Sequence, residues 1–113
     1  MQFDHEKLDV YQIAIEFVAW VYAISVTLKG HHRFARDQLL RASQSIPQNI
    51  AEGNAKRSIK DRKRFFEISR GSAMECASIL DILQCGRAIQ FSEIDEGKKN
   101  LKRMVSMLTK MTQ

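Results

Sequence analysis

Apolar residues recur along the chain at the spacing of an α-helix, in four segments that short polar turns separate. The first segment covers about residues 6–29. Its apolar positions follow steps of four and three residues, and they are Val10, Ala14, Phe17, Val21, Ile24 and Leu28. Because an α-helix has about 3.6 residues per turn, this spacing gathers the side chains on one face, as in a helix packed in a bundle.

Three further segments, about residues 33–52, 59–89 and 93–112, show the same period. The residues expected to face the core are Leu39, Ala42, Ile46, Ile50, Phe65, Ile68, Ser72, Cys76, Ile79, Leu83, Ile94, Leu101, Val105, Leu108 and Met111. Helices joined by short turns pack as antiparallel neighbours. The chain is therefore predicted to be all-α, a single domain over residues 1–113 that forms an antiparallel up-down-up-down four-helix bundle.

Small and polar residues mark the predicted helix ends. Gly30 suits the left-handed conformation that follows many helix C-termini, and Gly53 is expected to end the second helix. Ser58 and Ser92 each precede an aspartate by three residues, a spacing that resembles a capping box. We therefore expect these two serines to cap the third and fourth helices.

The first helix carries more apolar surface than a four-helix bundle needs. A second apolar line lies beside the first, so the apolar surface spans roughly 240° of the helix, and a peripheral helix in a monomer needs about half that width. The excess predicts a second copy of the chain as a partner. The oligomer interface is expected to contain Tyr11, Ile15, Val18, Trp20 and Tyr22.

Composition sets wider limits. The 113 residues are 44% hydrophobic, which supports a packed core, and the net charge of +5 permits an acidic partner such as nucleic acid. The N-terminal stretch lacks the apolar centre of a signal peptide, and no apolar run is long enough to span a membrane. Cys76 and Cys85 lack metal-ligand spacing and are expected to be buried, reduced thiols. We therefore expect a cytoplasmic protein with no membrane partner.

Positive charge concentrates between Lys56 and Arg64, where six of nine residues are basic. The candidate nucleic-acid-binding residues are Lys56, Arg57, Lys60, Arg62, Lys63 and Arg64, with Arg33 and Arg36 at the other end of the second helix. The helix macrodipole repels cations from a helix N-terminus, so stability does not explain the cluster. Phosphate groups suit it, and RNA or DNA would bind there through the backbone. The alternative is a solvated turn or a docking surface for an acidic protein.

One stretch has an unusual composition for a helix. Ser45 to Gly53, SIPQNIAEG, contains the only proline, Pro47, and a proline inside a helix costs roughly 3 kcal/mol. With the SRGS run from Ser69 to Ser72 and the following Glu75, this stretch resembles the family named after bacterial 23S rRNA intervening sequences. The resemblance implies a small cytosolic four-helix bundle, which in some members forms a homopentameric ring. Relatives include the accessory protein of diversity-generating retroelements, so the resemblance also implies a reverse transcriptase and nucleic acid as partners.

Polar residues of this signature follow one side of the second helix and the middle of the third. They are Arg41, Ser45, Asn49, Glu52, Arg70, Ser72 and Glu75. We expect a structural polar network that pairs Arg41 and Arg70 with Glu52 and Glu75 and fixes the register of the two helices. The alternative is a pocket for a ligand or for nucleic acid.

No set of residues suggests catalysis, a metal or a cofactor. His5 with Asp9, and the pair His31 and His32, lack a third ligand at a suitable spacing. Neither a phosphate-binding loop nor a dinucleotide-binding fingerprint occurs. We therefore expect a non-enzymatic oligomeric protein that binds nucleic acid through basic patches. The alternative is a structural scaffold that binds other proteins and no nucleic acid.

Overall fold

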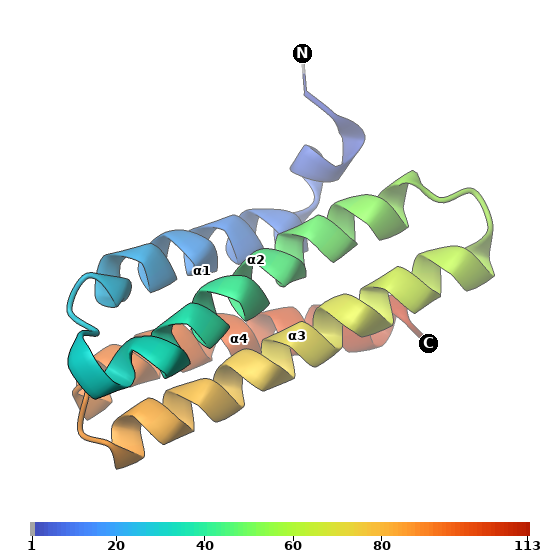
Figure 1. Ribbon diagram of the computed structural model, residues 1–113. Coiled ribbons are helices and arrows are strands. Elements are labelled where there is room, and N and C mark those ends of the chain that lie inside the picture. The colour runs from blue at the N-terminus through green and yellow to red at the C-terminus, as the bar shows by residue number, and fades with distance from the viewer. Residues whose placement is uncertain (1) are drawn as a thin grey trace.

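The computed structural model describes residues 2–113, which form four long α-helices (Figure 1). The helices are α1 (Asp9–Ser25), α2 (Arg33–Ala55), α3 (Ile59–Cys85) and α4 (Phe91–Met111), with short 3-10 turns η1 (Asp4–Lys7) and η2 (Gly30–His32). Successive helices run in opposite directions, and α1 and α3 occupy diagonal corners of the bundle. The predicted all-α, four-helix fold is confirmed. No helix among residues 2–113 has the length and apolar character needed to cross a bilayer.

All four helices contribute to the core, and α1 and α2 supply the apolar lines that the sequence predicts most clearly. All six residues of the predicted first line are buried, with Phe17 and Val21 completely enclosed. Leu39, Ala42 and Ile46 on α2 are likewise fully buried. Burying a large apolar side chain contributes about 1.5–3 kcal/mol, so these residues, with the buried residues of α3 and α4, supply the main stabilisation of the bundle.

The register of α3 differs from the prediction. Phe66 and Ser69 face the core in place of Phe65 and Ile68, and the Ile68 side chain is 45% exposed. Ser69 can be buried because its hydroxyl donates a hydrogen bond to the carbonyl oxygen of Ile46 on α2, at 2.9 Å. On α4, Met104 is fully buried at the position where Val105 was expected.

One of the predicted helix ends is correct: the backbone N–H of Asp61 donates to the Ser58 hydroxyl at 3.1 Å, which caps α3. Gly30 has the expected left-handed φ of 60°, but it does not end the first helix, because α1 already stops at Ser25 and Gly30 opens η2. The prediction for Ser92 is wrong, because α4 already begins at Phe91 after an extended Gln90. The first helix is shorter than expected, since extended Leu8 separates η1 from α1.

The third helix also ends earlier than expected, at Cys85, and the turn that follows is unusual. Gly86 has an ordinary φ of −77°, whereas Arg87 has a φ of 57°. Left-handed backbone disfavours residues with a Cβ, so glycine is the usual choice at such a position. Here the left-handed residue is Arg87 and not the adjacent Gly86.

Gly53 does not end α2, because the helix continues to Ala55. A Cβ at Gly53 would lie 2.7 Å from the ring of Phe66 and 3.1 Å from the carbonyl oxygen of Arg62. The glycine therefore permits close packing of α2 against α3, which is a different role from the predicted stop. Gly97 of α4 has a similar role, since a Cβ there would lie 2.5 Å from the ring of Trp20.

Pro47 lies within α2, and the helix is continuous on both sides of it. A proline cannot donate the backbone hydrogen bond that its position in a helix requires. Beside it, the carbonyl oxygen of Ile46 accepts the Ser69 hydroxyl from α3. The proline segment is thus attached to α3 by a hydrogen bond between helices, which helps to fix how the two helices align.

Candidate nucleic-acid interface

The turn between α2 and α3 places the predicted basic cluster at one end of the bundle, near both termini of the chain (Figure 1). The side chains of Arg57, Lys60 and Arg64 are exposed, and those of Lys56 and Lys63 are half-buried. These five residues are called the basic end below. Arg57, Lys60 and Arg64 make no hydrogen bond or ion pair with any residue in the described range 2–113. Their charge is therefore available to an external anion.

Arg62 belongs to the same run of sequence but has a different role. Its Nη1 donates to the carbonyl oxygens of Asn54 at 2.9 Å and Lys56 at 3.2 Å. Helix C-termini leave carbonyl oxygens unpaired, and a basic side chain can satisfy them. Arg62 therefore caps α2 and shapes the turn, and we exclude it from the basic end.

Phe65 gives the basic end an aromatic centre that the sequence prediction placed in the core. The Lys56 ammonium lies 5.1 Å from the centre of its ring, and the Arg64 guanidinium lies 4.9 Å from it. Cations are attracted to the face of an aromatic ring at this range. The line of buried residues that begins at Phe66 includes the serines Ser69 and Ser72. Because serine is polar, the apolar pattern does not show which of the two phenylalanines faces outward.

Arg33 and Arg36 lie at the opposite end of α2 and close the turn after α1. Arg36 donates to the carbonyl oxygen of Leu28 at 3.3 Å and to the carboxylate of Asp37 at 2.9 Å. Arg33 donates to the carbonyl oxygen of Gly30 at 3.2 Å. A helix rises about 1.5 Å per residue, so roughly 30 Å separate these arginines from the basic end. The structure does not bring the two groups into one site.

The predicted polar network forms in part, between α2 and α3. Arg41 and Glu75 make an ion pair, and the hydroxyl groups of Ser45 and Ser72 are 2.8 Å apart. The side-chain amide of Asn49 donates to the hydroxyl of Ser45 at 3.0 Å. These contacts connect residues of the two signature segments, in agreement with a role in helix register.

Arg70 and Glu52 do not join this network, which corrects the expected pairing. Arg70 donates to the Thr109 hydroxyl on α4 at 2.8 Å, so it contacts α4 and not the residues of α2. Glu52 is exposed and lies 3.9 Å from the ammonium of Lys56, one turn later on the same helix. Helix position alone could not distinguish these partners.

The residues proposed for an oligomer interface separate into two places. Tyr11, Ile15, Val18 and Tyr22 line a groove of about 340 Å³ between α1 and α2, which also contains Pro47. Trp20 points toward α4, where its ring packs against Gly97. The indole is therefore part of the packing within one chain, and we leave Trp20 out of the proposed interface.

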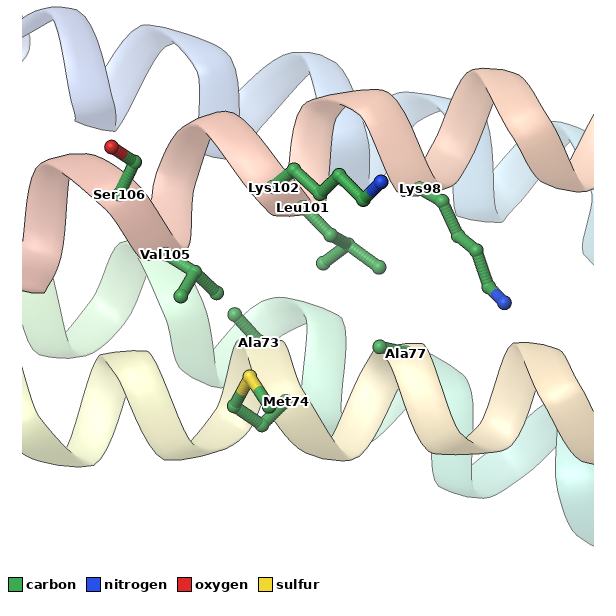
Figure 2. Close-up of a pocket in the computed structure, with 8 residues that line it drawn as sticks. All are labelled: Ala73, Met74, Ala77, Lys98, Leu101, Lys102, Val105 and Ser106. Atoms are coloured by element: carbon green, nitrogen blue, oxygen red, sulfur yellow. The ribbon is translucent and has the colours of Figure 1, made fainter.

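A second apolar groove, of about 390 Å³, lies between α3 and α4 (Figure 2). Ala73 and Ala77 leave space on α3, and Leu101 and Val105 line the facing side of α4. Lys98 and Lys102 of α4 border this groove, and Lys98 forms an ion pair with Asp81. Apolar walls do not suit phosphate groups, so this groove is not part of the candidate interface.

The other chemical candidates in residues 2–113 are clusters of metal-ligating side chains and the buried thiol of Cys76. Residues 2–113 contain no group of three or more His, Cys, Asp or Glu side chains that could hold a metal. Burial raises the pKa of the Cys76 thiol to about 12, with a further increase from Glu75 that Arg41 opposes. The thiolate is the reactive form of cysteine, so Cys76 is a structural side chain at neutral pH. Cys85 is exposed, so the prediction that both thiols are buried is wrong for this residue.

The fold and the basic end together define a small four-helix-bundle protein with a cationic surface at one end. Residues 6–110 match the family described as 23S rRNA-intervening sequence protein, and the chain belongs to this family. The comparison with curated proteins gave no match.

The fold is also similar to a solved structure from Bacteroides thetaiotaomicron, described as a protein of unknown function from the S23 ribosomal protein family. That structure superposes with a TM-score of 0.86 at 20% identity and covers 92% of this chain and 98% of its own chain. At this identity the similarity concerns the fold alone.

Proposed function

We propose that the protein is a non-enzymatic nucleic-acid-binding protein that holds the phosphate backbone of RNA or DNA at its basic end. The observation that carries the proposal is the exposure of Arg57, Lys60 and Arg64, whose side chains have no hydrogen-bond or ion-pair partner among residues 2–113. Clustered cations repel one another and the helix macrodipole, so an external polyanion would relieve both costs. Contact through the backbone predicts weak dependence on base sequence.

The proposal predicts binding that salt weakens steeply. Each phosphate contact to a single strand contributes about −0.7 to the slope of log affinity against log salt, so three contacts give about −2. Fluorescence anisotropy with a labelled RNA of about 20 nucleotides, between about 50 and 200 mM salt, measures this slope. Absence of salt-sensitive binding at the lower concentration would contradict the proposed function.

A second candidate function, self-association into a scaffold, is favoured by apolar surface on opposite sides of the bundle. Ile15 and Tyr22 of α1 line one groove, and Met74 of α3 lines the other. Because α1 and α3 lie at diagonal corners, a head-to-tail contact between copies would cover both surfaces. The five-membered ring that the family resemblance implies is one assembly of this kind, and it is compatible with nucleic-acid binding.

Ile15→Glu is expected to dissociate the assembly, because it places a charge in the groove that a second copy would bury. Ile15 is 45% exposed in the single chain, so the substitution should leave the fold intact. Light scattering should give a molar mass several times 13.0 kDa for the wild type and close to it for the variant. Val26→Glu, at an exposed position of the same segment outside the groove, is the control. A wild type of 13.0 kDa would contradict self-association.

A further inference from the structure

A pocket of about 640 Å³ opens beside the basic end, between η1 and the last turns of α2. Its lining includes Phe3 and His5 from the N-terminal turn and Gln48, Asn49, Glu52 and Ala55 from α2. The side-chain amide of Asn54 donates to the Asp4 carboxylate at 3.0 Å and holds η1 against α2. The volume lies in the range of sites that bind small organic groups.

The N-terminal side of this pocket is aromatic. Phe3 is 73% exposed, and its ring is nearly parallel to that of His5, with 5.9 Å between the ring centres. His5 in turn meets the ring of Tyr11 edge-on at 4.7 Å. So exposed a phenylalanine contributes little to the core, yet it offers a ring face to another aromatic group.

The polar groups of the pocket suit a neutral base better than a phosphate. No Lys or Arg belongs to its lining, and Glu52 places a carboxylate there. The amide nitrogen of Asn49 is engaged by Ser45, which leaves its carbonyl oxygen as an acceptor. Carboxylate and carbonyl oxygens repel a phosphate and accept hydrogen bonds from the N–H groups of a nucleobase.

The pocket and the basic end are connected through Lys56. The Lys56 ammonium lies 3.9 Å from the Glu52 carboxylate at the edge of the pocket and 5.1 Å from the centre of the Phe65 ring. Arg64 lies on the same ring. One strand could therefore place its phosphates along the basic end and turn a neighbouring base into the pocket.

We infer that the ligand of the basic end is a single-stranded nucleic acid, one unpaired base of which stacks on Phe3 in this pocket. The inference rests on the proposed function and specifies which nucleic acid the surface selects. In a duplex the bases are stacked on one another, so their faces are not available to Phe3 and the basic end meets the backbone. A single strand can add base–aromatic stacking, which is tolerant of sequence because every base has a π-face.

The test compares four nucleic acids of equal length: a single strand, the same strand with abasic sites, its duplex and an unrelated single strand. Phe3→Ala is expected to weaken binding of both normal single strands by about fivefold to a hundredfold, the effect of one stacked base. Binding of the duplex and of the abasic strand should not change. Phe3→Trp should retain the affinity, because indole also stacks.

Phe34→Ala is the matched control, since Phe34 is 76% exposed at the opposite end of the bundle. Equal effects of Phe3→Ala on normal and abasic strands, or equal wild-type affinity for them, would overturn the inference and leave backbone binding intact. If no nucleic acid binds the wild type with salt-dependent affinity, the proposed function and the inference both fail. Circular dichroism confirms that each variant is folded.

Discussion

Replacing Arg57, Lys60 and Arg64 together with glutamate is expected to lower the affinity for single-stranded RNA by about a hundredfold at about 0.1 M salt. Each lost phosphate contact removes about 0.7 log units at this concentration, and the salt slope should become shallower by about 2. The three side chains are exposed and have no ion-pair partner among residues 2–113, so the fold should be unaffected. Anisotropy titrations at several salt concentrations measure both quantities.

A control for net charge is available elsewhere in the chain. Lys29, Arg87 and Arg103 are also exposed, and their replacement by glutamate changes the total charge by the same amount. This control variant should lose much less affinity, because long-range repulsion is screened beyond about 10 Å at 0.1 M salt. Equal losses in the two variants would show that net charge, rather than the basic end, governs binding.

Gly53→Ala is expected to lower the free energy of unfolding by about 1–3 kcal/mol, although alanine is the better helix former. The added methyl group would lie 2.7 Å from the Phe66 ring and 3.1 Å from the backbone carbonyl of Arg62. The ring can shift only within a packed core, and the carbonyl belongs to α3 itself. Thermal unfolding should therefore show a fall in Tm of roughly 4 °C per kcal/mol.

Gly71→Ala is the matched control for this effect. Gly71 also lies inside a helix, but no atom outside that helix's own neighbouring backbone lies within 4 Å of the position of an added Cβ. The substitution should therefore raise the stability by about 0.5–1 kcal/mol through helix propensity alone. Equal Tm changes in the two variants would contradict close packing at Gly53.

The sequence predicts the cores of α1 and α2 well because their apolar residues repeat without interruption. In α3 the pattern is ambiguous, since Phe65 and Phe66 are adjacent and Ser69 is polar although buried. Which phenylalanine faces inward depends on a hydroxyl that finds its acceptor at Ile46 of another helix. Helical period within one segment carries no information about such a partner.

For the candidate site, the cluster of basic residues is evident from the sequence. Which of these residues cap a helix and which face solvent is not evident from it. Arg62 differs from Arg64 because α2 extends to Ala55 and brings its last carbonyl oxygens within reach of Arg62. The pocket at Phe3 depends on a hydrogen bond between Asp4 and Asn54, which are far apart in sequence. Neither feature has a local signature.

In the turn between α2 and α3, the residues that hold the backbone differ from the residues whose charged side chains face solvent. Arg62 and Ser58 hold the turn through contacts with the backbone, so its shape does not depend on the charges around it. Under the proposed function, substitutions at positions 57, 60 and 64 would change the strength of anion binding with little effect on folding. Different residues would then determine the affinity for the proposed ligand and the stability of the fold, and the ligand could change without changes in the core.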